Sequence, residues 1–214
     1  TVRGSNLATN SRLWEDRDFV NNKLPTSLDG TSVKINNKDA YINYISPLQL
    51  NVLSPLDSTE GPVQVTVTTT MGTSQAVTAT MQRFSPAFLI FNNDKYIAAR
   101  HADFSLLGPT TLFPGQTTPA RPDELVLLYG TGFGPTDPAI PNGEIVTAAG
   151  RLTNPVVVRI GGVQADVQFA GQSSTGLYQF NVRVPAATPN GDAAVAAEIG
   201  GIATAPNTFI NVQR

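Results

Sequence analysis

The chain contains a single histidine, His101, which stands two residues before Asp103 in the sequence Arg-His-Ala-Asp. A Ser-His-Asp hydrolase needs one histidine to move a proton and one carboxylate to orient its ring. The sequence has no Gly-x-Ser-x-Gly turn, and an aspartate two residues away in a loop rarely orients its neighbour's imidazole. A zinc site would require three or four ligands. We therefore expect His101 to be a structural residue with a hydrogen bond inside a loop, and we predict no catalytic residues.

A second feature of chemical interest is the glycine-rich run at 130–134, Gly-Thr-Gly-Phe-Gly. Such a run can be mistaken for a phosphate-binding loop, but no helical pattern and no Lys-Ser or Lys-Thr pair follows it. The other interpretation is a turn or bulge at the end of a strand, where glycine supplies a positive φ angle. We favour this interpretation because the matching positions earlier in the chain are Ser5 and Asn6.

Acidic side chains are scattered along the chain rather than grouped. A glycosidase needs two carboxylates that face one cleft about 5–10 Å apart, and the sequence alone pairs no two of them. Asp57 and Glu60 are candidates for binding calcium at one end of a domain, but no Asp-x-Asp-x-Asp-Gly loop supports this. We predict no metal site and no cofactor. The acidic residues considered are Asp16, Asp18, Asp29, Asp57, Glu60, Asp123, Glu124, Asp137 and Glu144.

A carbohydrate-binding face would need exposed, coplanar aromatic rings. Strand patterns place Tyr44, Phe169, Tyr178 and Phe180 in the interior. The remaining candidates for exposed rings are Trp14, Tyr41 and Tyr96, which lie in three different segments. A stacking platform for a glycan therefore stays open as an alternative and is not the preferred interpretation.

The composition limits the class of protein that has to position these residues. The chain has 214 residues, with 14 Lys and Arg against 16 Asp and Glu, so clustered basic charge for nucleic acid is missing. There is no Cys and no apolar run long enough to span a membrane. Only 14% of residues are charged, and Gly and Pro are frequent. These features are typical of an all-β protein with many turns.

The sequence also contains an internal repeat, which is the main clue to its domain organisation. Five blocks of the first half recur in the same order, at nearly constant separation, in the second half. The matched blocks begin at Val2 and Leu128, Val33 and Val158, Ala40 and Ala165, Gln49 and Gln179, and Gly61 and Gly191. The conserved order indicates a duplicated domain.

Within each repeat, apolar and polar residues alternate with period two, as in 48–52, 63–67 and 178–184. This period is typical of half-buried strands, and turn residues such as those at 36–37 and 161–162 separate them. Short strands at this spacing favour an immunoglobulin-type sandwich. We predict an all-β chain of two tandem immunoglobulin-like β-sandwich domains, residues 1–90 and 91–214. The expected core residues are Val33, Ile35, Ile42, Leu50, Val52, Val63, Val65, Val158, Ile160, Val167, Phe169, Phe180 and Val182.

Two segments fall outside this alternation. A short helical turn is expected within residues 10–23. The apolar stretches 88–91 and 96–99 flank a polar quartet at 92–95, which predicts a hairpin, and a proline-rich connection then leads to a strand beginning at Leu125. The large apolar residues of this hairpin should be mostly buried. They are Phe88, Ile90, Phe91, Tyr96 and Ile97.

Three motifs of the second repeat carry a family resemblance: Gly-Thr-Gly-Phe-Gly-Pro at 130–135, Val-Arg-Ile-Gly-Gly-Val-Gln-Ala at 158–165, and Gly-Leu-Tyr-Gln-Phe-Asn-Val-Arg-Val-Pro at 176–185. They resemble the uncharacterised C-terminal domain of secreted proteins of Solibacter-type acidobacteria, and both repeats resemble more distantly the IPT/TIG immunoglobulin-like fold. This resemblance implies an extracellular or cell-surface, non-catalytic β-sandwich module, and it brings no functional residues with it.

Only three residues precede the first Gly-Ser-Asn motif, so we expect the first repeat to lack its opening strand. An incomplete sandwich exposes an apolar groove and an unpaired sheet edge. Either the chain is a fragment that tolerates this, or a neighbouring chain supplies the strand and repeated donation builds a filament. The expected function is thus a structural or adhesive module whose partners are copies of itself or other extracellular domains. The alternative is a carbohydrate-binding module.

Overall fold

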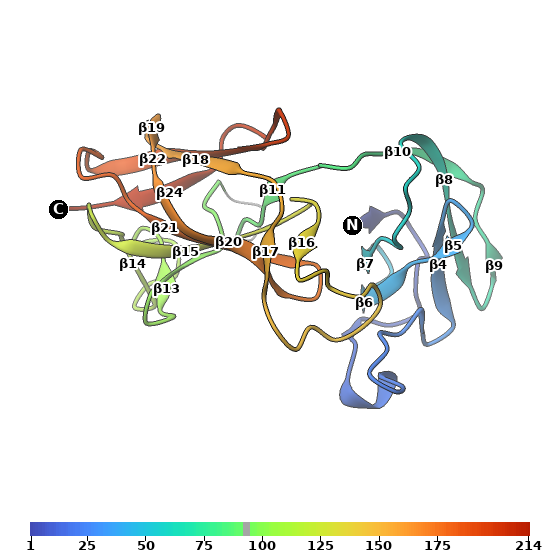
Figure 1. Cartoon of the computed structure of the whole chain (residues 1–214). Helices are drawn as coiled ribbons and strands as arrows, with labels where there is room; N and C mark the ends of the chain where they lie inside the picture. Colours follow the sequence, from blue (N-terminus) through green and yellow to red (C-terminus); the bar gives the residue numbers. More distant parts are fainter. Residues whose placement is uncertain (92–94) are drawn as a thin grey trace. The chain divides into compact units, whose positions relative to one another are not determined.

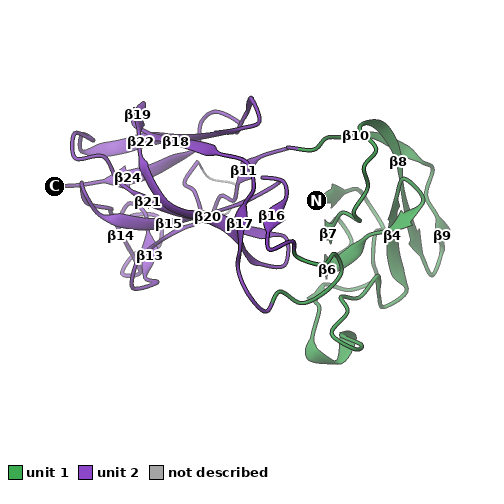
Figure 2. Cartoon of the chain, in the orientation of Figure 1, with its two compact units in different colours: residues 1–83, 140–146 green, residues 84–139, 147–214 purple. Residues whose placement is uncertain are grey.

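The computed structural model describes residues 1–91 and 95–214 (Figure 1). The described residues form 24 strands and one 3-10 turn, η1 (Asp16–Asp18), so the predicted all-β, sandwich-like fold and the helical turn within 10–23 are confirmed. Two compact units are present, residues 1–83 with 140–146 and residues 84–139 with 147–214 (Figure 2). The predicted ranges, 1–90 and 91–214, differ from these units in where they place 84–90 and 140–146. In the described part of the chain, no helix has the length and apolar character to cross a membrane.

Unit 1 contains two antiparallel sheets that share one core. The first has the order β1-β7-β6-β2, comprising β1 (Val2–Arg3), β7 (Gln49–Leu53), β6 (Tyr41–Ile45) and β2 (Arg12–Leu13). The second has the order β10-β8-β4-β3, comprising β10 (Val77–Met81), β8 (Gly61–Thr69), β4 (Thr31–Ile35) and β3 (Ser27–Leu28), with β5 (Lys38–Asp39) on β4 and β9 (Gly72–Thr73) on β8. Ile42 and Leu50 of the first sheet meet Leu28 and Val33 of the second in that core.

Unit 2 has a larger first sheet. Its order is β14-β13-β12-β15-β21-β20-β17-β16, comprising β14 (Thr117–Thr118), β13 (Leu106–Leu107), β12 (Ala99–His101), β15 (Leu125–Thr131), β21 (Leu177–Arg183), β20 (Asp166–Ser174), β17 (Gly150–Leu152) and β16 (Thr136–Asp137), with β11 (Ala87–Phe88) on β15. The second sheet has the order β19-β18-β22-β23, comprising β19 (Val163–Gln164), β18 (Val156–Ile160), β22 (Gly191–Ile199) and β23 (Ile202–Ala203), with β24 (Phe209–Val212) on β22. Side chains of both sheets again form a single core.

The long strand of the second sheet has corresponding partners in the two units, as the sequence repeat predicts. β8 and β22 are both nine residues long, and each pairs with a hairpin strand, β4 or β18, and with a later strand, β10 or β24. The hairpins turn through two residues with positive φ, Asn36 (51°) and Asn37 (62°) in unit 1, and Gly161 (61°) and Gly162 (81°) in unit 2. Both positive φ angles are what a type I′ turn requires, and Asn and Gly tolerate them.

Strands β6 and β20 carry a β-bulge at the same place in the repeat. Tyr44 lies opposite Asn51 and Phe169 opposite Asn181, each directly after a shift of register. A bulge breaks the alternation of faces, so Ile45 rather than Tyr44 is fully buried in β6. The prediction that Tyr44 and Phe169 belong to the core is therefore wrong, since both are only partly buried.

Most of the other expected core residues are buried. Phe180 is fully buried, and its ring centroid lies 4.5 Å from that of Phe133 and 5.8 Å from that of Phe88. The buried members of the expected set are Val33, Ile42, Leu50, Val63, Val158, Ile160, Phe180 and Val182. Ile35, Val52, Val65, Val167 and Tyr178 are partly buried and pack against the cores.

The connection between the repeats pairs as a hairpin. Ile90 bridges Ile97 in antiparallel fashion, and the Phe91 N–H donates to the Tyr96 backbone oxygen at 2.9 Å. The predicted turn at 92–95 lies largely outside the described residues. Phe88 and Ile97 are buried, and Phe91 and Tyr96 are partly buried. The expectation is wrong for Ile90, which is 40% exposed because this end of the hairpin lies at the surface.

Residues 140–146 belong to unit 1 although they lie inside the second repeat of the sequence. The Leu24 N–H donates to the Gly143 backbone oxygen at 2.8 Å, and Lys23 Nζ lies 2.5 Å from Glu144 Oε1. The chain therefore passes between the two units three times.

Candidate functional site

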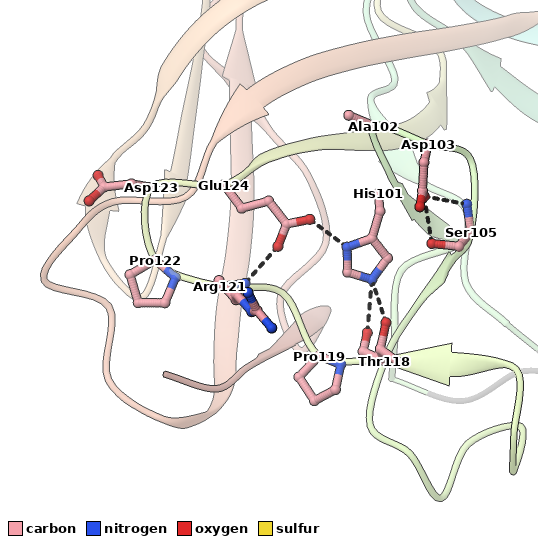
Figure 3. A pocket seen from close by; sticks show the side chains of 10 residues that line it. All are labelled: His101, Ala102, Asp103, Ser105, Thr118, Pro119, Arg121, Pro122, Asp123 and Glu124. Carbon is pink, nitrogen blue, oxygen red and sulfur yellow. Dashed lines mark hydrogen bonds and ion pairs between the residues drawn. The ribbon is translucent and has the colours of Figure 1, made fainter.

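The described part of unit 2 contains an open pocket of about 650 Å³ around His101 (Figure 3). Three elements bring its polar groups together: His101 ends β12, Thr118 ends β14, and Glu124 stands directly before β15. The β12–β15 ladder places His101 opposite Val126, next to Glu124. The remaining lining residues are Ala102, Asp103, Ser105, Pro119, Arg121, Pro122 and Asp123.

Both nitrogens of the His101 ring have partners, as Figure 3 shows. Nδ1 lies 2.5 Å from Glu124 Oε1, and Nε2 lies 2.9 Å from Thr118 Oγ1 and 3.1 Å from the Thr118 backbone oxygen. The second carboxylate oxygen of Glu124 accepts the Arg121 N–H at 2.7 Å. The side chains of His101 and Glu124 are only 12% and 24% exposed. The ring thus ties β12 to β14 and to the start of β15.

Asp103, the carboxylate that sequence places beside His101, has a different role. Its Oδ1 accepts the Ser105 N–H at 2.9 Å and the Ser105 hydroxyl at 2.6 Å. The bond from the Ser105 hydroxyl is the main reason that the pKa of Asp103 is lowered. Asp103 therefore closes the turn after β12, and Glu124 is the carboxylate on the imidazole. No sequence motif indicates this pair, because strand pairing brings together residues that are 23 positions apart.

Thr118, His101 and Glu124 have the connectivity of a nucleophile, a base and an orienting carboxylate. The threonine hydroxyl, however, shares Nε2 with a backbone oxygen that can only accept a hydrogen bond. A proton held on Nε2 by this oxygen prevents the nitrogen from taking the proton of the hydroxyl. The geometry therefore favours a structural role for His101, whose hydrogen bonds connect β12 to β14 and to the start of β15, over the role of a general base.

The glycine-rich run at 130–134 is the end of a strand, as predicted. Gly132 has a φ of 77°, and a Cβ there would lie 2.0 Å from the Ser85 backbone oxygen. The Ser85 N–H donates to the Gly132 oxygen at 2.9 Å. Glycine is required here because the segment before β11 passes directly over the run. In unit 1 the matching residue is Asn6, with a φ of 56°.

The acidic candidates for a calcium site in unit 1 are held by donors of the protein itself. Asp57 accepts the Thr59 N–H at 3.0 Å and the Asn36 amide at 2.7 Å, and lies 3.3 Å from Lys38 Nζ. These bonds, with that from the Thr59 backbone first, hold the pKa of Asp57 well below its usual range. Glu60 is exposed, and the described residues contain no group of three or more His, Cys, Asp or Glu side chains that could hold a metal ion.

A second pair of carboxylates surrounds Arg12. Its guanidinium donates to both oxygens of Asp29 at 2.8 Å, and to the two oxygens of Asp18 at 2.7 and 3.1 Å. Hydrogen bonds from Arg12 are the main cause of the lowered pKa of each carboxyl group. The cluster joins the segment around η1 to the turn before β4, and its carboxylates are already neutralised.

The three aromatic residues considered for glycan stacking are each engaged locally. Trp14 packs against the core of unit 1 and lies 5.4 Å from the Phe19 ring. Tyr41 lies directly beneath Gly143, where an added Cβ would approach its ring to 2.2 Å. Tyr96 donates its hydroxyl to Asp192 at 3.0 Å. The described side chains therefore give the carbohydrate-binding alternative no support.

A different candidate surface lies on β10 of unit 1. Val77, Ala79 and Met81 lie opposite residues of β8 that face the core, and opposite residues of paired strands point to the same face. We call these three residues the β10 face. Ala79 is nevertheless exposed, whereas Ile210, its counterpart in β24, is only 1% exposed, and Val77 is 67% exposed. The β10 face is thus an apolar inner surface that is covered in unit 2 and open in unit 1.

Comparison with known proteins adds no identification. No family model matches the chain, and no curated protein sequence matches it.

Proposed function

We propose that the chain is a non-catalytic structural or adhesive module that acts outside the cell or at its surface and associates through unit 1. The observation that carries the proposal is the open β10 face. Its counterpart in unit 2 is covered, so the same sandwich has one closed and one open form in a single chain. An exposed apolar surface on a strand at a sheet edge favours association. The motifs that resemble secreted acidobacterial domains support the extracellular setting.

Association by strand donation would be directional. If a neighbouring chain covers the β10 face with a strand, each copy is an acceptor at one place and a donor at another. Such head-to-tail contacts do not close on themselves and produce a filament. The partners are then copies of the same chain or other extracellular domains.

The proposed self-association can be tested by measuring the particle size. Light scattering and negative-stain microscopy of the full chain over a range of concentrations should show growing particles. Val77→Asp, which places a charge on the β10 face, should abolish the growth. Thr80→Asp, on the opposite face of the same strand, serves as the matched control and should retain it. A chain that stays monomeric at every concentration contradicts the proposed association.

The hydrogen bonds of His101 support the non-catalytic part of the proposal. The backbone oxygen of Thr118 can accept the proton of Nε2, so this nitrogen is not available to deprotonate the Thr118 hydroxyl. A screen with ester, amide and glycoside substrates should show no turnover that depends on His101. The comparison is His101→Ala, measured beside the unchanged chain. Turnover that is lost in His101→Ala and in Thr118→Val would show instead that the three residues act as a catalytic triad.

A further inference from the structure

The outer edge of β10 carries backbone groups that no described residue pairs. β10 is the last strand of its sheet, so β8 is its neighbour on one side only. In the β8 ladder Thr80 lies opposite Pro62, which has no N–H to donate. Residues of an antiparallel pair alternate between bonded and non-bonded positions, so the N–H and C=O groups of Thr80 and Thr78 point away from β8. An unpaired edge therefore runs beside the open β10 face.

Unit 2 shows how the equivalent edge is completed. Phe209 of β24 is the counterpart of Thr78 of β10. Thr78 pairs with the fourth residue of β8, and Phe209 pairs with the fourth residue of β22. The Phe209 N–H donates to the Lys95 oxygen at 2.9 Å, and its oxygen accepts the Ile97 N–H at 3.0 Å. The bridge between Tyr96 and Phe209 is parallel. The segment 95–97 therefore pairs as an extra parallel strand on this edge.

A second short segment continues the pairing. Asn211, the counterpart of Thr80, accepts the Ala120 N–H at 2.9 Å, and the bridge of this segment to β24 is also parallel. Ile97 and Ala120 are both buried, at 1% and 0% exposure, and cover the apolar face that includes Ile210. Within residues 1–83 and 140–146, no described segment occupies the corresponding place on β10.

We propose that the edge of β10 accepts an extended peptide strand from a neighbouring polypeptide, which runs parallel to β10 and places aliphatic side chains over the β10 face. The inference rests on the proposed function and names what the open surface of unit 1 binds. The direction follows from the parallel bridges in unit 2. Tyr96 bridges Phe209 in parallel, so Ile97 lies in register with Ile210, the counterpart of Ala79. Ala79 is smaller than Ile210, so the donor strand has room at this position for a side chain at least as large as that of Ile97.

The sequence of β10 suits an acceptor. Natural edge strands are commonly protected by charged residues, proline or bulges. Residues 77–81 have the sequence Val-Thr-Ala-Thr-Met, which contains no charged residue and no proline. The pairing with β8 is regular over all five residues, so there is no bulge. Main-chain hydrogen bonds can therefore form along the edge, while the β10 face selects apolar side chains at alternate positions of the donor.

The test uses the full chain and a labelled peptide with the sequence of residues 95–101, Lys-Tyr-Ile-Ala-Ala-Arg-His. Fluorescence anisotropy should show saturable binding, and the same peptide with Ile97→Asp should bind at least about tenfold more weakly, the loss of one buried aliphatic contact. In the protein, Thr78→Pro removes the outward N–H without removing a backbone hydrogen bond to β8. It should weaken binding about fivefold or more, the effect of one main-chain hydrogen bond.

Thr78→Ala is the matched control, because it keeps the N–H and loses the same side-chain bond from Gln64. It should bind the peptide within about twofold of the unchanged chain. Circular dichroism and thermal unfolding of both variants establish that they are folded. No saturable binding, or equal binding by the Thr78→Pro and Thr78→Ala proteins, overturns the proposal.

The direction of the strand is tested separately. The chain has no Cys, so Gln75→Cys, just before β10, creates a unique site for a fluorophore. A quencher on the N-terminus of the peptide should quench this fluorophore more than one on its C-terminus. The reverse order would show antiparallel binding and overturn the parallel assignment.

The experiments distinguish peptide binding at the edge of β10 from self-association of the chain. Peptide binding by a chain that remains monomeric supports the acceptor edge and contradicts self-association. Growing particles that the peptide neither binds nor inhibits support self-association and overturn the acceptor edge. Discrete dimers that the peptide does not dissociate would point to β10 pairing with itself, which also overturns the strand-acceptor proposal.

Discussion

Phe180 shows how much one side chain contributes to unit 2. Its ring is fully buried between those of Phe88 and Phe133. Phe180→Ala should lower the free energy of unfolding by about 3–5 kcal/mol, measured by urea denaturation. Phe169→Ala is the control, because that ring is partly buried beneath Arg151 at 5.1 Å. An equal loss in both variants would contradict the assignment of Phe180 to the core centre.

The hydrogen bonds between Asp29 and Arg12 should make the stability of unit 1 depend on pH under acidic conditions. They lower the pKa of Asp29 in the folded chain. A carboxylate of this kind stabilises the fold above its unfolded pKa, about 3.9, and the contribution is lost as the pH falls further. The unfolding free energy should therefore drop more steeply between about pH 4 and pH 2 in the unchanged chain than in Asp29→Asn. Asparagine also tolerates the φ of 46° at this position.

Urea denaturation at a series of pH values measures this difference. Asp39→Asn is the control, because its ion pair with Lys34 is exposed on both sides and contributes little. It should follow the unchanged chain. Parallel curves for the unchanged chain and the Asp29→Asn protein would contradict the role of the Arg12 cluster.

The hydrogen bonds of His101 were only partly predictable from the sequence. The hydrogen-bonded state of His101 could be expected, because a lone histidine near a turn has backbone groups within reach. Its partners could not, since Thr118 and Glu124 lie 17 and 23 positions away. Glu124 meets the ring through the pairing of β12 with β15, and Thr118 meets it through β13, which pairs with both β12 and β14. Asp103, the nearest carboxylate in sequence, bonds to its own turn instead.

At the scale of the elements, the end of β15 depends on the close approach of the segment before β11. Gly132 and Gly115 have the same φ of 77°, but only at Gly132 would a Cβ meet another group, the Ser85 oxygen at 2.0 Å. Gly115→Ala should therefore cost about 1 kcal/mol from backbone strain alone. Gly132→Ala adds a backbone clash and should cost clearly more. Thermal unfolding of the two variants measures the difference, and equal losses would rule out the clash.

The strands themselves were largely predictable. Alternation of apolar and polar residues marks β7, β8 and β21, and the paired turn residues Asn36-Asn37 and Gly161-Gly162 mark the hairpins. The bulges of β6 and β20 were not predictable, because the sequence shows no sign of one extra residue between two faces. Tyr44 and Phe169 were misplaced for this reason. The open β10 face was not predictable either, because it is defined by the contrast between exposed Ala79 and its buried counterpart Ile210 in unit 2.

At the scale of the whole molecule, the segment 140–146 makes unit 1 depend on the second repeat. Replacing these residues with a Gly-Ser linker of equal length removes the contact of Lys23 with Glu144. It also gives more conformational freedom to the backbone whose oxygen accepts the Leu24 N–H. Amide hydrogen exchange should then become faster in β4 and β8, while β21 keeps its protection. Unchanged exchange in β4 and β8 would show that unit 1 is complete without the segment.

The same segment sets an order of events during synthesis. A ribosome releases the chain from its N-terminus, so residues 1–83 emerge well before 140–146. Unit 1 can reach its final contacts only after residues 84–139 of unit 2 have also left the ribosome. The two repeats, although similar in strand pattern, therefore cannot be exchanged as independent modules without leaving unit 1 incomplete.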